Sequence, residues 1–167
     1  RFALLPLRLE AASLLEEVDA LIADGATVES ICLDLLAPAA RKLGTMWEDD
    51  ECDFLDVTMG LWRLQEVMRE VAARSPADRV MHDPLRSALF SPMPGDNHNF
   101  GTLMIEEVFA RGGWQSEALV RPERRELLDR IARQPFDVVG LTVTRDCPSA
   151  ALAHLIKAMR NVSANPH

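Results

Sequence analysis

The 167-residue sequence is poor in aromatic residues, in cysteine and in positive charge. It has no tyrosine, and aromatic residues make up only 5% of the chain. Its three cysteines are odd in number and widely spaced, which argues against a disulfide framework and gives no zinc-ligand spacing. Lys and Arg number 18 against 26 Asp and Glu, so the formal net charge is -8. Because the basic residues are also scattered, direct binding to nucleic acid is not expected.

Several sequence features that mark other classes of protein are missing as well. No apolar run approaches the length of a membrane span, and no charged-then-apolar leader begins the sequence, so a cytoplasmic protein is expected. There is no nucleophile elbow, no glycine loop for phosphate and no loop with paired catalytic carboxylates. The hydrophobic content of 48% is enough for packed cores. We therefore expect a globular protein that is not an enzyme.

The first half of the chain has helical periodicity. One apolar stripe ends at Gly25, a second runs from a Thr27 cap to Gly44 with a kink at Pro38, and a third begins at Phe54. Residues 1–76 are therefore predicted to form an antiparallel helical bundle.

The second half alternates short apolar runs with amphipathic helices. Residues 77–84 form a polar, proline-marked linker, and a second domain is predicted for residues 85–167. Strands are expected at 87–91, 114–119 and 137–144, and helices at 100–111, at 123–133 and around 152–159. This α/β order predicts a parallel, Rossmann-like (flavodoxin-like) sheet. Because the sequence stops where a fourth strand is expected, the domain is predicted to be truncated at its C-terminus.

The loop after the first predicted strand carries the most informative motif, Asp96-x-His98-x-x-Gly101. A histidine at the carboxyl edge of such a strand lies where ligands bind. An aspartate two residues earlier can accept one imidazole N–H while the other nitrogen coordinates a metal, so His98 is the candidate metal ligand. The alternative is a surface histidine, with Asp96 capping the next helix. Gly101 fits either a close approach to a bulky ligand or an ordinary helix start.

A helical bundle followed by an α/β domain with this motif resembles the cobalamin-binding modules of corrinoid methyltransferases and light-sensing regulators. The resemblance assigns axial coordination of cobalt to His98, tuning of the ligand to Asp96, and coverage of the upper corrin face to the bundle. The segment from Leu43 to Trp47 looks like the family's Leu-Gly-x-x-Trp, which places Trp47 over the cofactor. As a residue type alone, Trp47 is equally well a core residue.

The sequence departs from that family at three points. Val57 and Thr58 stand where the cobalamin photoreceptors have a Glu-His pair, so an upper axial histidine is missing. The family's Ser-x-Leu or Ser-x-Thr becomes Thr142-Val143-Thr144, whose hydroxyls are candidate contacts to a ligand. The family's later Gly-Gly element is not in the sequence.

With these departures the chain most resembles the SCHIC-type modules of the photosynthesis antirepressors AppA, PpaA and AerR. That resemblance implies a light- and redox-responsive regulatory module that binds heme, with cobalamin as the alternative tetrapyrrole. It also implies contact with a transcriptional repressor of the PpsR/CrtJ type, and a flavin-binding blue-light domain in the same full-length chain. A neutral imidazole binds iron and cobalt alike, so the motif does not choose the metal.

Two other functions fit the same residues. The first is a corrinoid-carrying methyltransferase component, which the missing glycine pair and the residues at 57 and 58 disfavour. The second is a cofactor-free protein interaction domain in which only the fold persists. Binding of methylcobalamin or of hemin distinguishes the three.

Overall fold

The computed structural model describes residues 2–75, 82, 84–144 and 146–166. The chain divides into two compact units, Arg1–Ala77 and Asp78–His167, each described below by itself. In these described ranges, no helix combines the length and the apolar character needed to cross a membrane.

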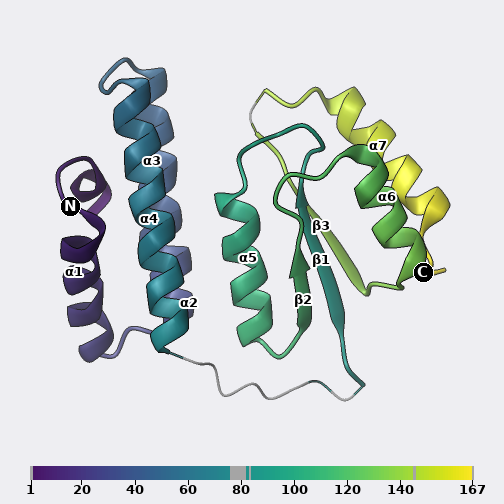
Figure 1. Ribbon diagram of the computed structural model, residues 1–167, viewed down its shortest axis with the longest axis horizontal. Helices are drawn as coiled ribbons and strands as arrows, with labels where there is room; N and C mark the ends of the chain where they lie inside the picture. Colours follow the sequence, from purple (N-terminus) through teal and green to yellow (C-terminus); the bar gives the residue numbers. More distant parts are fainter. Residues whose placement is uncertain (1, 76–81, 83, 145, 167) are drawn as a thin grey trace. The chain divides into compact units, whose positions relative to one another are not determined.

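The first unit is helical, as predicted (Figure 1). Its elements are the 3-10 helix η1 (Phe2–Leu7), α1 (Ala11–Ala23), α2 (Val28–Ser30), the π-helix η2 (Ile31–Leu36), α3 (Ala37–Glu48) and α4 (Phe54–Arg74). The side chains of Leu14, Val18, Leu43 and Leu64 are fully buried between these helices. Each such burial stabilises the fold by roughly 1.5–3 kcal/mol.

Polar residues define where these helices begin. The Thr27 side chain accepts a hydrogen bond from the Ser30 N–H at 3.1 Å, which confirms Thr27 as a cap. Asp53 accepts from the Asp56 N–H at 2.8 Å, and the Asp56 carboxylate accepts from the Asp53 N–H at 3.2 Å. This reciprocal capping box fixes the start of α4, because it satisfies two N–H groups that lack a partner within the helix.

The predicted end of the second helix at Gly44 is wrong. The helix continues through Gly44 to Glu48, because Leu43 and Met46 on either side still face the core. A glycine ends a helix when it adopts the left-handed conformation. Gly25 does so, with φ of 99°, and closes α1 as predicted, whereas Gly44 keeps a negative φ.

Near Pro38, where the sequence predicts a kink, the type of helix changes just before the proline. Proline has no N–H to donate to the preceding turn. The π-helix η2 lies directly before it, and the Ala37 N–H donates to the Cys32 carbonyl, five residues earlier. The helix axis therefore continues from α2 through η2 into α3.

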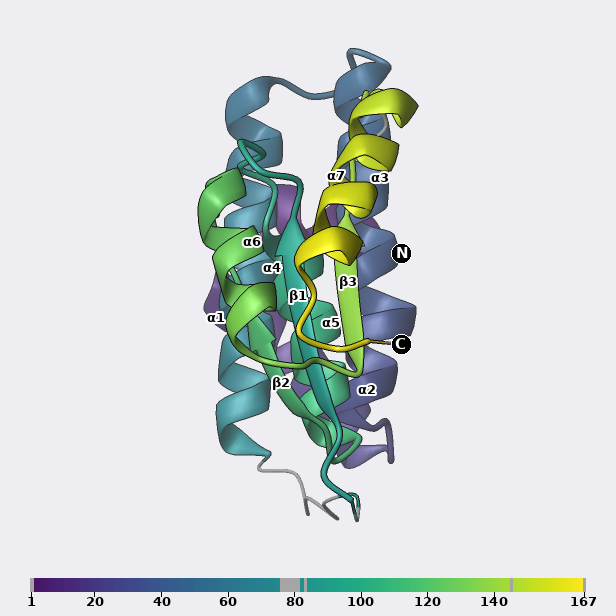
Figure 2. The same ribbon diagram turned by 90° about the vertical axis from the view of Figure 1, so that its right-hand side faces the viewer.

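The second unit is a parallel α/β fold with strand order β2-β1-β3. Its elements are β1 (Ser87–Pro92), α5 (Phe100–Arg111), β2 (Gln115–Ala118), α6 (Arg124–Arg133), β3 (Val138–Thr142) and α7 (Ser149–Val162). Figures 1 and 2 show α5 on one face of the sheet and α6 and α7 on the other. All three predicted strands and all three predicted helices are present, and both pairings of β1 are parallel.

The alternating side chains of β1 fill both faces of the sheet. Leu89 belongs to a buried cluster with Leu127 of α6 and Leu155 of α7. Phe90 points to the opposite face, where its ring packs edge-on against Phe109 of α5 at 4.8 Å between centroids. Because β1 is covered on both sides, it reads in the sequence as a continuous apolar run.

The Phe90 ring also explains a glycine in the neighbouring strand. Gly140 of β3 lies beside Phe90 in the parallel register. A Cβ atom built on Gly140 would lie 2.6 Å from the ring of Phe90. No side chain fits that gap, so the ring occupies the space that a residue at 140 would otherwise fill.

Candidate functional site

The carboxyl edge of the sheet brings together most of the residues predicted for the site. The loop after β1 leads to α5 on one face of the sheet, and the loop after β3 leads to α7 on the other face. The loops after β1 and β3 therefore leave the sheet in opposite directions. Ligands of doubly wound α/β folds bind at such a switch point between neighbouring strands.

The loop after β1 is held in place by a tight turn. The Asp96 N–H donates to the Met93 carbonyl at 2.9 Å, and Gly95 at the third position has φ of 88°. With Pro94 at the second position, these features define a type II turn. The Met93 N–H in turn donates to the Thr142 carbonyl at 3.1 Å, which ties the loop to the end of β3.

Asp96 and His98 form the pair that the motif predicts. Asp96 Oδ1 lies 2.5 Å from His98 Nδ1 and also accepts from the His98 backbone N–H at 2.9 Å. The Asp96 side chain is 15% exposed and that of His98 is 75% exposed. Asp96 thus fixes the imidazole, and it leaves Nε2 as the nitrogen that can bind a metal.

Of the alternative interpretation, the surface position of His98 is confirmed, because its side chain is 75% exposed, whereas the role of Asp96 as a helix cap is wrong. The N-cap of α5 is Asn99, whose side chain makes no capping hydrogen bond. The Asp96 carboxylate instead bonds to the backbone and ring of His98, within the loop itself. The pair therefore orients the ring and contributes nothing to the start of α5.

Two threonines join the end of β3 to the start of α5. Thr142 Oγ1 lies 2.7 Å from Thr102 Oγ1, and Thr102 is fully buried. Thr144 accepts a hydrogen bond from the Cys147 N–H through its carbonyl at 3.1 Å. A Cβ on Gly101 would meet only Thr142 Cγ2, at 4.0 Å. The fold therefore has room for a side chain at position 101.

Sequence reasoning missed Thr102. The hydroxyls of Thr102 and Thr142 share one hydrogen bond. When one hydroxyl donates in this bond, the other must accept. The available signal was a threonine one residue after Gly101 on an otherwise apolar helix face. Threonine in a first helical turn is common, however, and its partner lies 40 residues away in the sequence.

Trp47 belongs to the first unit, near the end of α3, and is 50% exposed. The interpretation of Trp47 as a core residue is therefore wrong, and the interpretation as an accessible flat surface remains. Gly44 lies one turn earlier, and a Cβ built on it would meet nothing within 4 Å. Residues three apart share a helix face, so this side of α3 offers an indole next to bare backbone.

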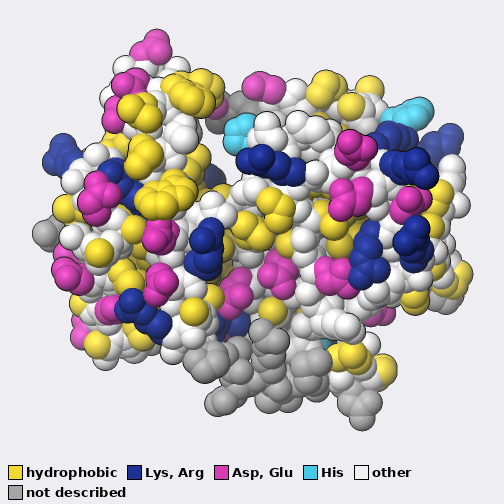
Figure 3. All heavy atoms as spheres, viewed as in Figure 1, with side chains coloured by type: hydrophobic (Ala, Val, Ile, Leu, Met, Phe, Trp, Pro, Cys, Tyr) yellow, Lys and Arg dark blue, Asp and Glu magenta, His cyan; other side chains and the backbone are white. Residues whose placement is uncertain are grey.

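Further apolar side chains are exposed on the neighbouring helix. Phe54, Leu55 and Trp62 of α4 are 70%, 66% and 52% exposed. Figure 3 shows hydrophobic side chains at the surface over α3 and α4 of the first unit. Phe54 had been placed in the buried stripe by periodicity; it stands at the first position of α4, beside the capping box. Exposed apolar groups in such number are typical of a binding surface.

The residues at 57 and 58 offer no metal ligand. Val57 is buried in the bundle, and Thr58 is exposed with its hydroxyl donating to the Phe54 carbonyl at 2.7 Å. Across the part of the chain that the structure describes, no three or more His, Cys, Asp and Glu side chains gather as a metal cluster. A bare ion would need several protein ligands, whereas a tetrapyrrole metal already has four and needs one axial histidine.

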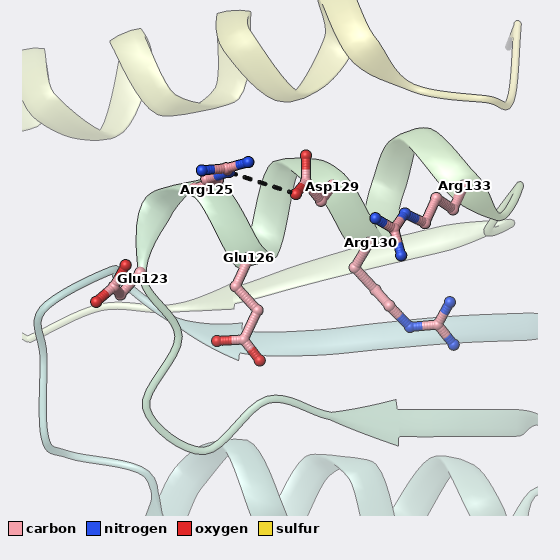
Figure 4. A pocket seen from close by; sticks show the side chains of 6 residues that line it. All are labelled: Glu123, Arg125, Glu126, Asp129, Arg130 and Arg133. Atoms are coloured by element: carbon pink, nitrogen blue, oxygen red, sulfur yellow. Dashed lines mark ion pairs between the residues drawn. The ribbon is translucent and has the colours of Figure 1, made fainter.

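Two hollows in the second unit have different chemistry from this edge. One, of about 400 Å³, follows α6 and is lined only by charged side chains, shown in Figure 4. Three acidic and three basic residues line it, and Arg125 pairs with Asp129 at 3.8 Å. The other, of about 520 Å³, is an apolar groove along β3 and α7. Neither contains the Asp96–His98 pair.

Comparison with known proteins follows the division into units. Residues 2–72 match the family described as B12 binding domain. That match spans the helical unit and does not include the Asp96–His98 loop.

Two further likenesses extend over most of the chain. It is 26% identical over 136 residues to an "uncharacterized 20.5 kDa protein in bchF-crtJ intergenic region" of Rhodobacter capsulatus, covering 81% of this chain and 71% of that relative. The structure resembles the Methanosarcina barkeri monomethylamine corrinoid protein with a TM-score of 0.77 at 14% identity, covering 96% of this chain and 76% of the other. The fold is therefore a helical bundle followed by a Rossmann-like unit of the B12-binding type.

Proposed function

We propose that this chain is a non-enzymatic regulatory module that binds a tetrapyrrole through His98 and acts by protein contact. The observation that carries the proposal is the Asp96–His98 pair at the switch point between β1 and β3, with Nε2 left free. A heme or a corrinoid would supply a metal whose ring nitrogens fill four positions. His98 then needs to provide only one axial bond, which suits a site with a single histidine.

The first unit supports the same proposal independently. Its match to a B12 binding domain concerns the residues that carry the exposed Trp47 and the open backbone at Gly44. A flat macrocycle gains from burial against such an apolar surface, about 25 cal/mol for each Å² removed from water. The residues at 57 and 58 offer no second axial ligand, which favours a site open on one side of the metal.

The regulatory part of the proposal rests on the resemblance to the photosynthesis antirepressors, AppA in particular. The Rhodobacter relative is named for its place in the bchF-crtJ intergenic region, in keeping with such a role. The partner we propose is a transcriptional repressor of the PpsR/CrtJ type. The net charge of -8 makes contact with that protein, rather than with its DNA, the expected route.

Ligand binding is tested by titrating the purified chain with hemin and, separately, with hydroxocobalamin, and by recording absorption spectra. We expect one equivalent of one of these to be retained on gel filtration, with a spectrum typical of histidine ligation. His98→Ala should lose that spectrum. His154→Ala is the matched control, because His154 is exposed on α7 and away from the motif. Identical spectra for wild type and His98→Ala would refute ligation by His98.

The partner contact has a separate test. A PpsR/CrtJ-type repressor is bound to fluorescently labelled target DNA, and the chain is added with and without its tetrapyrrole. Release of the DNA, seen as a fall in anisotropy, is the expected result. Unchanged anisotropy and no co-elution with the repressor would remove the antirepressor role, while leaving the ligand-binding result intact.

A further inference from the structure

A cationic side chain of α3 lies beside the surface that the proposed function assigns to the ligand. Arg41 stands three residues before Gly44 and Trp47 three residues after it, so both side chains flank the glycine on the helix surface. The two positions are about 9 Å apart along the helix axis. Because a Cβ built on Gly44 would meet nothing within 4 Å, neither flanking side chain fills the space over that backbone. This side of α3 therefore offers a guanidinium, an open gap and an indole in succession.

The guanidinium of Arg41 is left without an acidic partner. Its side chain is exposed, and it forms no ion pair with any residue that the structure describes. The four residues one helical turn away on either side are small and uncharged: Ala37, Pro38, Gly44 and Thr45. By contrast, the adjacent Lys42 pairs with Glu51 at 3.6 Å. Arg41 can therefore bind an anion from outside the helix without breaking an existing pair.

The charge of the helical unit makes such a cation necessary for an anionic ligand. Residues 1–77 hold 15 acidic and 7 basic residues, so the unit as a whole repels negative charge. A carboxylate that approaches this unit gains only where it contacts a cation closely enough to offset the repulsion. Arg41 provides that contact next to the open backbone at Gly44.

We propose that Arg41 binds a carboxylate of the tetrapyrrole and so makes heme, rather than a corrinoid, the preferred ligand. The inference rests on the proposed function, in which His98 holds the metal. Heme carries two propionate side chains whose carboxylates are ionised at neutral pH, whereas the corresponding side chains of cobalamin are neutral amides. A planar guanidinium donates two parallel N–H groups to a carboxylate, and an amide cannot match that charge-assisted contact.

The spacing on α3 suits a ligand of this kind. A porphyrin held by one propionate at Arg41 would extend toward the gap at Gly44 and the flat indole of Trp47. The indole offers an apolar surface for the ring, and the guanidinium offers a partner for the carboxylate at its edge. Arg41 thus acts as a specificity-determining residue, separate from the axial bond that His98 provides.

Equilibrium titrations with three ligands test the proposal: hemin, hemin dimethyl ester, in which both carboxylates are masked, and hydroxocobalamin. Wild type should bind hemin most tightly. Arg41→Gln should weaken hemin binding by about five- to tenfold, as expected for a partly exposed bond between charged groups. Its affinity for the ester should stay that of wild type, so the loss is coupled to the carboxylates. Arg41→Lys should recover part of the hemin affinity, because it restores the charge without the planar geometry.

Lys42→Gln is the matched control. It removes the same charge one residue away, from a side chain that is already paired with Glu51. Hemin affinity should then change by no more than about twofold, since a separated exposed charge is screened by salt. The spectrum of histidine ligation should persist in Arg41→Gln, because the axial ligand is untouched.

Three results would overturn the role of Arg41 and leave ligation by His98 standing. Equal weakening of hemin binding by Arg41→Gln and Lys42→Gln would show a general effect of charge. Equal weakening of hemin and its dimethyl ester by Arg41→Gln would show contact with the ring rather than with its carboxylates. Tighter binding of hydroxocobalamin than of hemin by wild type would make the corrinoid the preferred ligand. Failure of wild type to retain any of the three ligands would overturn the proposed function together with this inference.

Discussion

The two units expose opposite kinds of side chain, although each buries an apolar core. The helical unit leaves Trp47, Phe54, Leu55 and Trp62 at its surface. Near the carboxyl ends of its strands, the α/β unit carries the Asp96 carboxylate, the His98 imidazole and the hydroxyls of Thr102 and Thr142. A tetrapyrrole requires both kinds of contact, an apolar surface for its ring and a polar ligand for its metal.

The same contrast holds for the two glycines that are least expected in regular structure. Gly140 lies in a strand, where a Cβ would press into the Phe90 ring at 2.6 Å. Gly44 lies inside a helix, where a Cβ would meet nothing within 4 Å. Packing against Phe90 therefore requires a glycine at position 140, whereas nothing packed around Gly44 requires one there. A bound ligand is the explanation that the proposed function gives for Gly44.

Replacing Gly140 should produce the largest change in stability. Gly140→Ala forces the Phe90 ring out of its contact with Phe109 and should lower the free energy of unfolding of the second unit by about 1–3 kcal/mol. Urea denaturation followed by circular dichroism measures it. In a double-mutant cycle, Phe90→Leu should remove part of the penalty. Full additivity of the two substitutions would show that the ring contact is not the cause.

Removing Asp96 should weaken tetrapyrrole binding rather than folding. Loss of the carboxylate that orients a ligating histidine typically reduces metal affinity by roughly ten- to a hundredfold. Asp96→Ala should therefore show that loss in the hemin or hydroxocobalamin titration, with its unfolding midpoint near wild type. Asp129→Ala, which removes an exposed pair on α6, is the control. Equal affinity of wild type and Asp96→Ala for the tetrapyrrole would show that Asp96 does not contribute to ligand binding.

The capping box at α4 should have an intermediate effect confined to the first unit. Asp53→Ala leaves the Asp56 N–H without its acceptor and should cost about 1 kcal/mol of stability. Asp53→Ser, which can still cap, should recover most of it. The measurement is the urea transition of the helical unit, followed by the fluorescence of the exposed Trp62. A larger loss in the α/β unit than in the bundle would contradict this assignment.

Gly44→Ala should change stability only slightly, and in the opposite direction. Alanine in an open helix interior is favoured over glycine by about 0.5–1 kcal/mol, so the apoprotein should become more stable. If the ligand approaches this face, the same methyl group should weaken tetrapyrrole binding. A gain in stability together with unchanged affinity would place the ligand away from Gly44.

The smallest expected effect is a pH dependence of the second unit. The pKa of Asp137 is lowered because the Ser87 N–H donates to its carboxylate, helped by the Ser87 hydroxyl. Its contribution to stability is thus complete above the unfolded-state pKa and is lost as the pH falls through the lower folded-state pKa. Denaturation midpoints between neutral and acidic pH should show this fall, and Asp137→Asn should flatten it. An unchanged slope in Asp137→Asn would assign the effect to other carboxylates.

Much of the secondary structure could be predicted from the sequence because it depends on neighbours along the chain. Helical spacing of apolar residues predicted α1, α4 and α5, and the continuous apolar run from Ser87 predicted β1. The Thr27 cap and the closing role of Gly25 also depend on local geometry. The predicted helix end at Gly44 is wrong because the local sequence does not reveal whether a glycine keeps a helical φ.

The candidate site was predictable only in part. The Asp96–His98 pair is local, two residues apart, and its hydrogen bond follows from the turn at Gly95. The contact between Thr102 and Thr142 spans 40 residues and exists only because β1 and β3 are neighbours in the sheet. No pattern in the sequence states which strand lies beside which.

By itself, the sequence determined the helical and strand periods, the turn before His98 and the charge that disfavours nucleic acid, since each depends on residues close in the chain or on composition. Tertiary structure decided that Trp47 is exposed rather than buried, that Gly140 makes room for Phe90, and that the hydroxyls of Thr102 and Thr142 meet. These properties depend on which distant segments pack together. Burial and close contact depend on two or more segments that pack together, so the periodicity of one segment cannot predict them.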